Sequence, residues 1–201
     1  MAKIVSYLPK DLPDRKLGYR KALISKNALL ESQGQLNLFL HPDEKVGRLR
    51  LRRITPHLSP FEEALMLDEK GDPKAESRYL EAIDQASATA DALCNLGVLY
   101  ASRGDTAKSI GALTKALSLN PRHVESHYNL ANVYFDASNY DLAIIHYEVA
   151  LEIDAQFSDA WFNLSLAYLS LKNHTKSFDA FLQFKKLKPE EGSELDNLFK
   201  S

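Results

Sequence analysis

The chain has 201 residues and a formal net charge of -2, with 45 % hydrophobic and 26 % charged residues, which is typical of a globular protein. Its single cysteine, Cys94, excludes an intramolecular disulfide framework and favours a reducing, cytoplasmic setting. No apolar run is long enough to span a membrane, and the apolar stretch near the start is too short for a secretory signal, so no membrane association is expected.

The small net charge hides an uneven distribution along the chain. Residues 1–57 carry 12 basic and 5 acidic side chains, a net charge of +7, whereas residues 58–201 carry 13 and 22, a net charge of -9. Such asymmetry indicates either an anionic partner, such as a nucleic acid, or docking of the basic segment on the acidic remainder.

The basic segment, residues 1–57, has the pattern of a helix followed by a β-hairpin. Residues 14–32 are loosely amphipathic, and residues 35–40 and 47–54 alternate with strand periodicity around a turn-like stretch. A lone hairpin is marginal in water, so we expect it to pack on the helices, on a second copy or on another partner. A flexible arm is the alternative.

The second predicted strand places arginines on one side. Arg48, Arg50 and Arg52, with Arg53 beside them, have a geometry suited to phosphate contacts. Aromatic residues are few in this segment, and charge runs are more often solvated faces or intramolecular partners. Nucleic-acid binding is therefore the second hypothesis for this segment.

Residues 58–89 read as two short helices around a turn at Gly71, with Ala75, Tyr79 and Ala82 following in order. The same order recurs downstream at a period of 34 residues, over the gapless segments 90–123, 124–157 and 158–191. Within each matched column, the residues of the three segments are either all large or all small. They comprise Leu96, Leu130 and Leu164; Gly97, Ala131 and Ser165; Tyr100, Tyr134 and Tyr168; and Leu113, Tyr147 and Phe181.

Each segment shows helical periodicity in both halves, and small residues opposite large ones let two antiparallel helices approach closely. The pattern resembles the tetratricopeptide repeat (TPR) family, whose period is 34 residues. The resemblance implies a mainly α fold, a right-handed α-solenoid of helix–turn–helix repeats. Three full repeats follow one degenerate repeat over 58–89. Residues 192–201 are expected to form a C-terminal cap, a short helix with Ser193 as its N-cap.

The resemblance also implies that the first helix of each repeat lines a concave face where peptides bind. Asn95, Asn129 and Asn163 recur in one column of these helices, and a carboxamide can pair with the backbone of an extended peptide. The alternative is that each asparagine satisfies a backbone group within its own hairpin. Four neighbours would add selectivity or, alternatively, pack between hairpins: Tyr128, Asn132, Phe135 and Phe162.

The same helices carry acidic residues and no lysine or arginine over 91–102, 125–136 and 159–170. The Lys and Arg clamp for a terminal carboxylate that the family often uses is therefore absent. A basic or neutral peptide fits Asp91, Glu125 and Asp159 better, although acids in a first helical turn also complement the helix dipole.

No residue pattern indicates catalysis, a cofactor or a metal. His123, Glu125 and His127 lack the spacing of a zinc motif and a third ligand, and no glycine-rich phosphate loop occurs. We therefore expect a non-catalytic adaptor that binds a protein or peptide in the concave groove. The alternative is a nucleic-acid-associated factor. The basic segment could instead occupy the groove of its own chain or form a homodimer.

Overall fold

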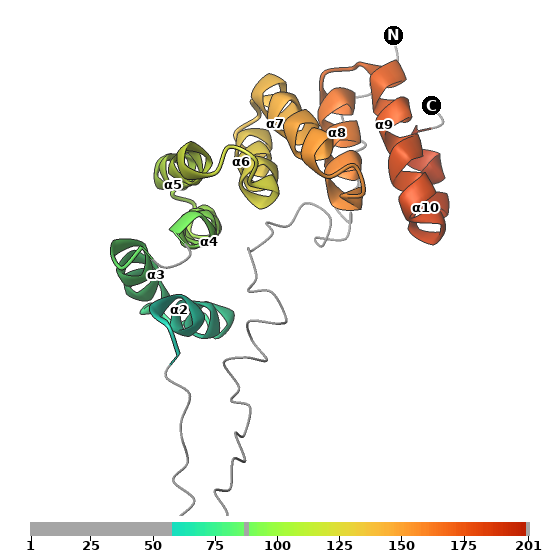
Figure 1. The fold of residues 1–201 in the computed structure, drawn as a ribbon. Helices are drawn as coiled ribbons and strands as arrows, with labels where there is room; N and C mark the ends of the chain where they lie inside the picture. The colour runs from blue at the N-terminus through green and yellow to red at the C-terminus, as the bar shows by residue number, and fades with distance from the viewer. Residues whose placement is uncertain (1–57, 87–88, 200–201) are drawn as a thin grey trace, which may run out of the picture. The chain divides into compact units, whose positions relative to one another are not determined.

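The computed structural model describes residues 58–86 and 89–199, and all regular structure in this part of the chain is helical. The helix predicted over 14–32 and the predicted hairpin lie outside the described residues. The helices fall into two compact units, one containing α2 and α3 and the other α4 to α10 (Figure 1).

The first unit is a hairpin of α2 (Pro60–Glu69) and α3 (Ala75–Asp84). The α2 helix begins with a capping box, in which the Ser59 hydroxyl accepts from the Glu62 backbone and the Glu62 carboxylate accepts from the Ser59 N–H. Buried Tyr79 joins the two helices, because its ring lies 6.2 Å from that of Phe61 and its hydroxyl donates to Asp68 at 3.0 Å.

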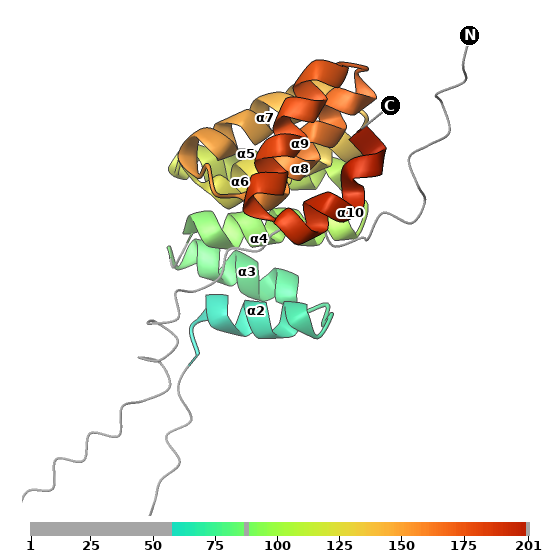
Figure 2. The ribbon, with the colours of Figure 1, turned by 90° about the vertical axis from the view of Figure 1, so that its right-hand side faces the viewer.

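The second unit contains three helical hairpins and a final helix. They are α4 (Thr89–Ser102) with α5 (Thr106–Leu119), α6 (Val124–Asp136) with α7 (Tyr140–Ile153), α8 (Ser158–Ser170) with α9 (His174–Leu187), and α10 (Pro189–Phe199). Successive hairpins stack through α5 on α6 and α7 on α8, while α4, α6 and α8 also contact one another in series. We call the first helices α4, α6 and α8, which contact one another in this order, the inner row; Figure 2 draws the same helices from another side.

The turns inside these hairpins repeat at the 34-residue period. Gly104, Ser138 and Lys172 all have positive φ, at 77°, 57° and 60°. The residue after each one caps the second helix, since the side chains of Asp105, Asn139 and Asn173 accept the backbone N–H three residues on. Among these three hairpins, only α4–α5 has a glycine at the left-handed position, where a side chain is unfavourable.

Close approach of the paired helices depends on the small column. A Cβ built on Gly97 would lie 2.7 Å from Leu113 Cγ, so this position has no room for a side chain. The buried hydroxyls of Ser109 and Ser177 donate to the carbonyls of Gly97 and Ser165 at 2.8 and 2.9 Å, which locks the first and third hairpins.

The final helix differs from the prediction. We expected it to start after Ser193, but α10 begins at Pro189, and the Ser193 hydroxyl donates to the Pro189 carbonyl inside the helix at 2.8 Å. Proline favours the first helical turn because its missing N–H would have no partner there, so the helix starts five residues earlier. Among the described helices, none is long and apolar enough to cross a membrane.

Candidate functional site

The three repeated asparagines lie on the inner row of helices, one each on α4, α6 and α8. All three are fully buried, with 0 % exposure for Asn95, Asn129 and Asn163. The bonds described for Asn129 and Asn163 reach the preceding hairpin, because Asn129 Nδ2 donates to Cys94 Sγ at 3.3 Å and Asn163 Nδ2 donates to the Tyr128 hydroxyl at 3.1 Å. Two members of this asparagine column, Asn129 and Asn163, thus link successive hairpins to each other.

Asn163 lies at the end of a buried polar network between α8, α6 and α7. Its Nδ2 also donates to Asn132 Oδ1 at 3.1 Å, and that oxygen accepts the Tyr147 hydroxyl at 2.5 Å. Because Asn132 Oδ1 can only accept, the orientation of the Asn163 amide is set. Asn163 Oδ1 therefore points away from these partners, and it is buried without any hydrogen bond.

The aromatic residues proposed as peptide anchors are packed between helices. Tyr128 and Phe162 are each 1 % exposed. The Tyr128 ring lies 4.6 Å from Phe157, and the Phe162 ring lies 5.1 Å from Phe184. Phe135 is half-buried against Tyr140 at 5.2 Å. These contacts agree with the packing alternative, while a role in peptide binding remains a prediction.

One acidic side chain of the inner row holds two hairpins together. Asp91 on α4 lies 3.0 Å from Nε2 of His123, the N-cap of α6, whose Nδ1 accepts the Ser126 N–H at 3.1 Å. Burial lowers the pKa of His123, but the bond to Asp91 together with the interactions with Cys94 and Glu125 outweighs burial and raises the pKa. The cap opposes this rise because it requires an unprotonated Nδ1, so we assign the ring as neutral, with its hydrogen on Nε2.

The other two acidic residues have fewer contacts. Glu125 lies 3.8 Å from His123 Nδ1, and Asp159 accepts the Ser158 hydroxyl at 3.3 Å. Both lie in the first turns of α6 and α8, where carboxylates complement the helix dipole. A role of Glu125 and Asp159 in ligand binding stays a prediction.

A histidine pair in the second hairpin could not be recognised from the sequence. His127 Nδ1 lies 3.1 Å from His146 Nδ1, and His127 Nε2 lies 3.1 Å from the Pro121 carbonyl. The carbonyl can only accept, so His127 donates to it through Nε2 and accepts from His146. Burial lowers the pKa of both rings, that of His146 to about 4. The His146 ring also stacks on Tyr134 at 5.7 Å.

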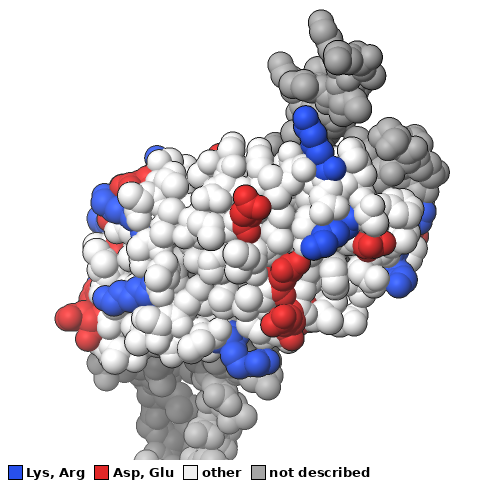
Figure 3. Space-filling view, turned by 90° about the horizontal axis from the view of Figure 1, so that it is seen from above, with Lys and Arg blue, Asp and Glu red and all other residues white. Residues whose placement is uncertain are grey.

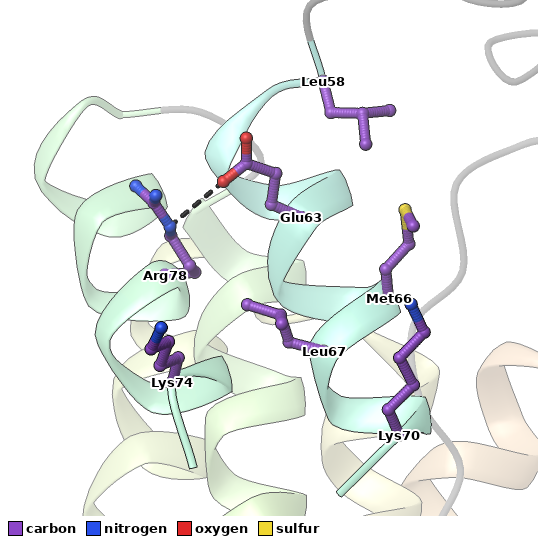
Figure 4. A pocket seen from close by; sticks show the side chains of 7 residues that line it. All are labelled: Leu58, Glu63, Met66, Leu67, Lys70, Lys74 and Arg78. Carbon is purple, nitrogen blue, oxygen red and sulfur yellow. Dashed lines mark ion pairs between the residues drawn. The ribbon is translucent and has the colours of Figure 1, made fainter. Parts of the chain in front are cut away.

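The hollows of the described surface include two that lie between packed helices. The larger, about 490 Å³, lies between α7, α8 and α9, and we call it the α7–α9 cleft. The smaller, about 260 Å³, lies on the α2–α3 hairpin, where Leu67 faces Lys74 and Arg78 (Figure 4). Arg78 is paired there with Glu63 at 3.0 Å. No group of three or more metal-ligating side chains exists among the described residues.

Family models match the repeated part of the chain. Residues 73–117 and 96–157 match one tetratricopeptide repeat model, and residues 158–191 match another. Together these matches span more than half of the chain. The chain belongs to the tetratricopeptide repeat family.

Individual TPR proteins resemble the chain more distantly. Human tetratricopeptide repeat protein 6 (Homo sapiens) is 25 % identical over 109 residues, which are 54 % of this chain but only 21 % of that protein. A crystal structure of MamA aligns with a TM-score of 0.58 and 25 % identity, covering 63 % of this chain and 74 % of MamA.

The first TPR domain of Spaghetti (RPAP3), bound to the HSP90 peptide SRMEEVD, aligns with a TM-score of 0.51 and 19 % identity. The alignment covers 56 % of this chain and 94 % of that domain. This last likeness shows the fold alone.

The residues of the nucleic-acid hypothesis, Arg48, Arg50, Arg52 and Arg53, lie outside the described residues. On the face drawn in Figure 3, the described acidic and basic side chains are interspersed among mostly uncharged atoms. That face therefore has no extended basic surface of the kind that follows a phosphate backbone.

Proposed function

We propose that the chain is a non-catalytic adaptor, and that its α4–α9 repeats bind an extended segment of a partner protein along α4, α6 and α8. Membership of the TPR family supports a role in protein interaction. The likeness to a TPR domain bound to a peptide supports the same role at the level of the fold. We infer the contacts and the kind of peptide from the side chains of α4, α6 and α8.

The observation that carries the proposal is the unused acceptor on Asn163. A buried polar atom without a hydrogen bond costs roughly 1–3 kcal/mol, so the Oδ1 of Asn163 favours any donor that reaches it. A backbone N–H of an extended peptide is such a donor, and every residue except proline provides one. Because Oδ1 has no exposed surface, binding requires the side chains around it to change rotamer.

The charges of the inner helices define the kind of peptide. The helices α4, α6 and α8 contain no lysine or arginine, and their first turns carry Asp91, Glu125 and Asp159. The peptide SRMEEVD, in contrast, has three acidic side chains in its last four residues, and an intact terminal carboxylate adds a fourth negative charge. We therefore propose a basic or neutral ligand for this chain.

The experiment is selection from a displayed random-peptide library on the immobilised full chain, followed by fluorescence anisotropy with the enriched peptides. Asn163→Leu removes the acceptor and should weaken binding about three- to tenfold, the value of one hydrogen bond. Tyr147→Phe is the matched control, because it damages the same network but keeps Asn163 Oδ1. We expect its affinity to stay within about twofold of the parent.

Two results would contradict the proposal. The first is the absence of any peptide enriched above an unrelated immobilised protein. The second is an Asn163→Leu variant that binds every selected peptide as tightly as the parent chain, which would leave the asparagine column with a purely structural role.

A further inference from the structure

The α7–α9 cleft is lined by two aromatic walls and an acidic rim. Trp161 and Tyr168 come from α8, Leu151 comes from α7, and Ala180 and Gln183 come from α9. Leu151 and Ala180 are almost fully buried, at 6 % and 4 % exposure, and form the apolar floor. The cleft is separate from the asparagine column, because none of its lining residues belongs to that column.

Comparison with the preceding repeat explains why a hollow exists here. Residues 34 positions earlier are His127 in place of Trp161, Tyr134 in place of Tyr168 and His146 in place of Ala180. In the second hairpin the His146 ring stacks on Tyr134 and bonds to His127, so that space is filled. In the third hairpin a methyl group replaces the imidazole, which leaves space beside Trp161 and Tyr168.

The rim of this cleft carries carboxylates, unlike the equivalent positions one repeat earlier. Glu148, Glu152 and Asp179 are exposed, and the residues 34 positions before them are the uncharged Thr114, Ser118 and Ile145. None of the three makes an ion pair with a described residue. Glu148 accepts the Tyr168 hydroxyl, which uses only one of its oxygens.

Lys176, the one cationic residue in the lining of this cleft, already contacts another lining residue. Lys176 Nζ lies 5.2 Å from the centre of the Tyr168 ring and covers that aromatic face. Trp161 donates its indole N–H outside the cleft, to the Ala155 carbonyl at 3.0 Å, which fixes the ring. The cleft thus presents a fixed indole and two or three unpaired carboxylates around an apolar floor.

We propose that this cleft binds an arginine side chain from a partner protein, with an apolar neighbour of that arginine on the Leu151 floor. A planar guanidinium can stack on an indole and at the same time donate to carboxylates in a forked geometry, which an ammonium cannot do. The net negative lining complements the cation, and the floor accepts the apolar neighbour. This surface is independent of the asparagine column, so the two proposals can fail separately.

The test uses the fluorescence of Trp161, the single tryptophan of the chain. The full chain is titrated with a short acetylated and amidated peptide that has one arginine between two leucines. The control peptide has citrulline in place of arginine, which keeps the shape and removes the charge. We expect a saturable change in emission with the arginine peptide that weakens with added salt, and no such change with the citrulline peptide.

Variants of the full chain separate charge from shape. Glu152→Gln with Asp179→Asn should weaken the arginine peptide about fivefold or more, whereas Asp84→Asn with Glu190→Gln removes two exposed carboxylates elsewhere and should change nothing. Ala180→His copies the second repeat and should abolish binding by filling the hollow, with the fold checked by circular dichroism. Equal responses to both peptides, no response to either, or full affinity in the rim variant would overturn the proposal.

Discussion

The histidine pair of His127, which is buried, and His146, which is half-buried, makes the stability of the chain depend on pH. Burial in the folded chain lowers the pKa of His146 to about 4, from the ordinary value of 6.5 that applies when the chain is unfolded. Between these two values the unfolded chain binds a proton that the folded chain does not, so the free energy of unfolding rises with pH in this window. The contribution is complete above pH 6.5 and is lost as the pH falls toward 4.

The size of the effect follows from the two pKa values. At pH 5 the difference corresponds to about 2 kcal/mol for His146 alone. The ring is half-buried, so solvent screening reduces this to about 1–2 kcal/mol. His127 adds to the loss in the same direction, because burial lowers its pKa as well.

The assay is urea unfolding of the full chain at pH 7.5 and pH 5, followed by circular dichroism and Trp161 fluorescence. The variant His127→Leu with His146→Ala gives the second repeat the residues of the first, Leu93 and Ala112, and should show a pH dependence smaller by about 1–2 kcal/mol. His174→Gln removes an exposed histidine and serves as the control. If the double variant loses as much stability at pH 5 as the parent chain, the reasoning is refuted.

Two further predictions concern backbone and packing. Gly97→Ala should lower the free energy of unfolding by about 1–2 kcal/mol because its Cβ meets Leu113, whereas Gly111→Ala, which meets nothing within 4 Å, should raise it by about 0.5–1 kcal/mol through helix propensity. A gain in both variants in urea unfolding would show that Leu113 moves aside freely. Ser138→Gly and Lys172→Gly should each stabilise by about 0.5–1 kcal/mol because both positions have positive φ, and unchanged midpoints would contradict this.

The periodicity of the sequence determined the helical hairpins. Helix formation depends on residues close in sequence, so the 34-residue columns of small and large residues were sufficient to predict α4 to α9. The predicted start of α10 was wrong. The prediction used Ser193 as the N-cap, although Pro189 is itself a strong signal of the first helical turn.

The candidate site could be predicted only in part. The sequence indicated that Asn95, Asn129 and Asn163 share one face of the first helices, but not that all three are buried. Burial and pairing depend on neighbours from another hairpin, as between Asn163 and Tyr128, which lie 35 residues apart in the chain. The helical period of one segment contains no information about which side chain of the next segment meets it.

The sequence by itself determined the family, the hairpins and the absence of basic residues from α4, α6 and α8, because these follow from repeated local patterns. Only the tertiary structure decided that Asn163 Oδ1 lacks a donor, that His127 pairs with His146, and that Ala180 leaves a hollow beside Trp161. Each of these features arises where side chains from two or three helices meet, so its physical cause is packing geometry between elements.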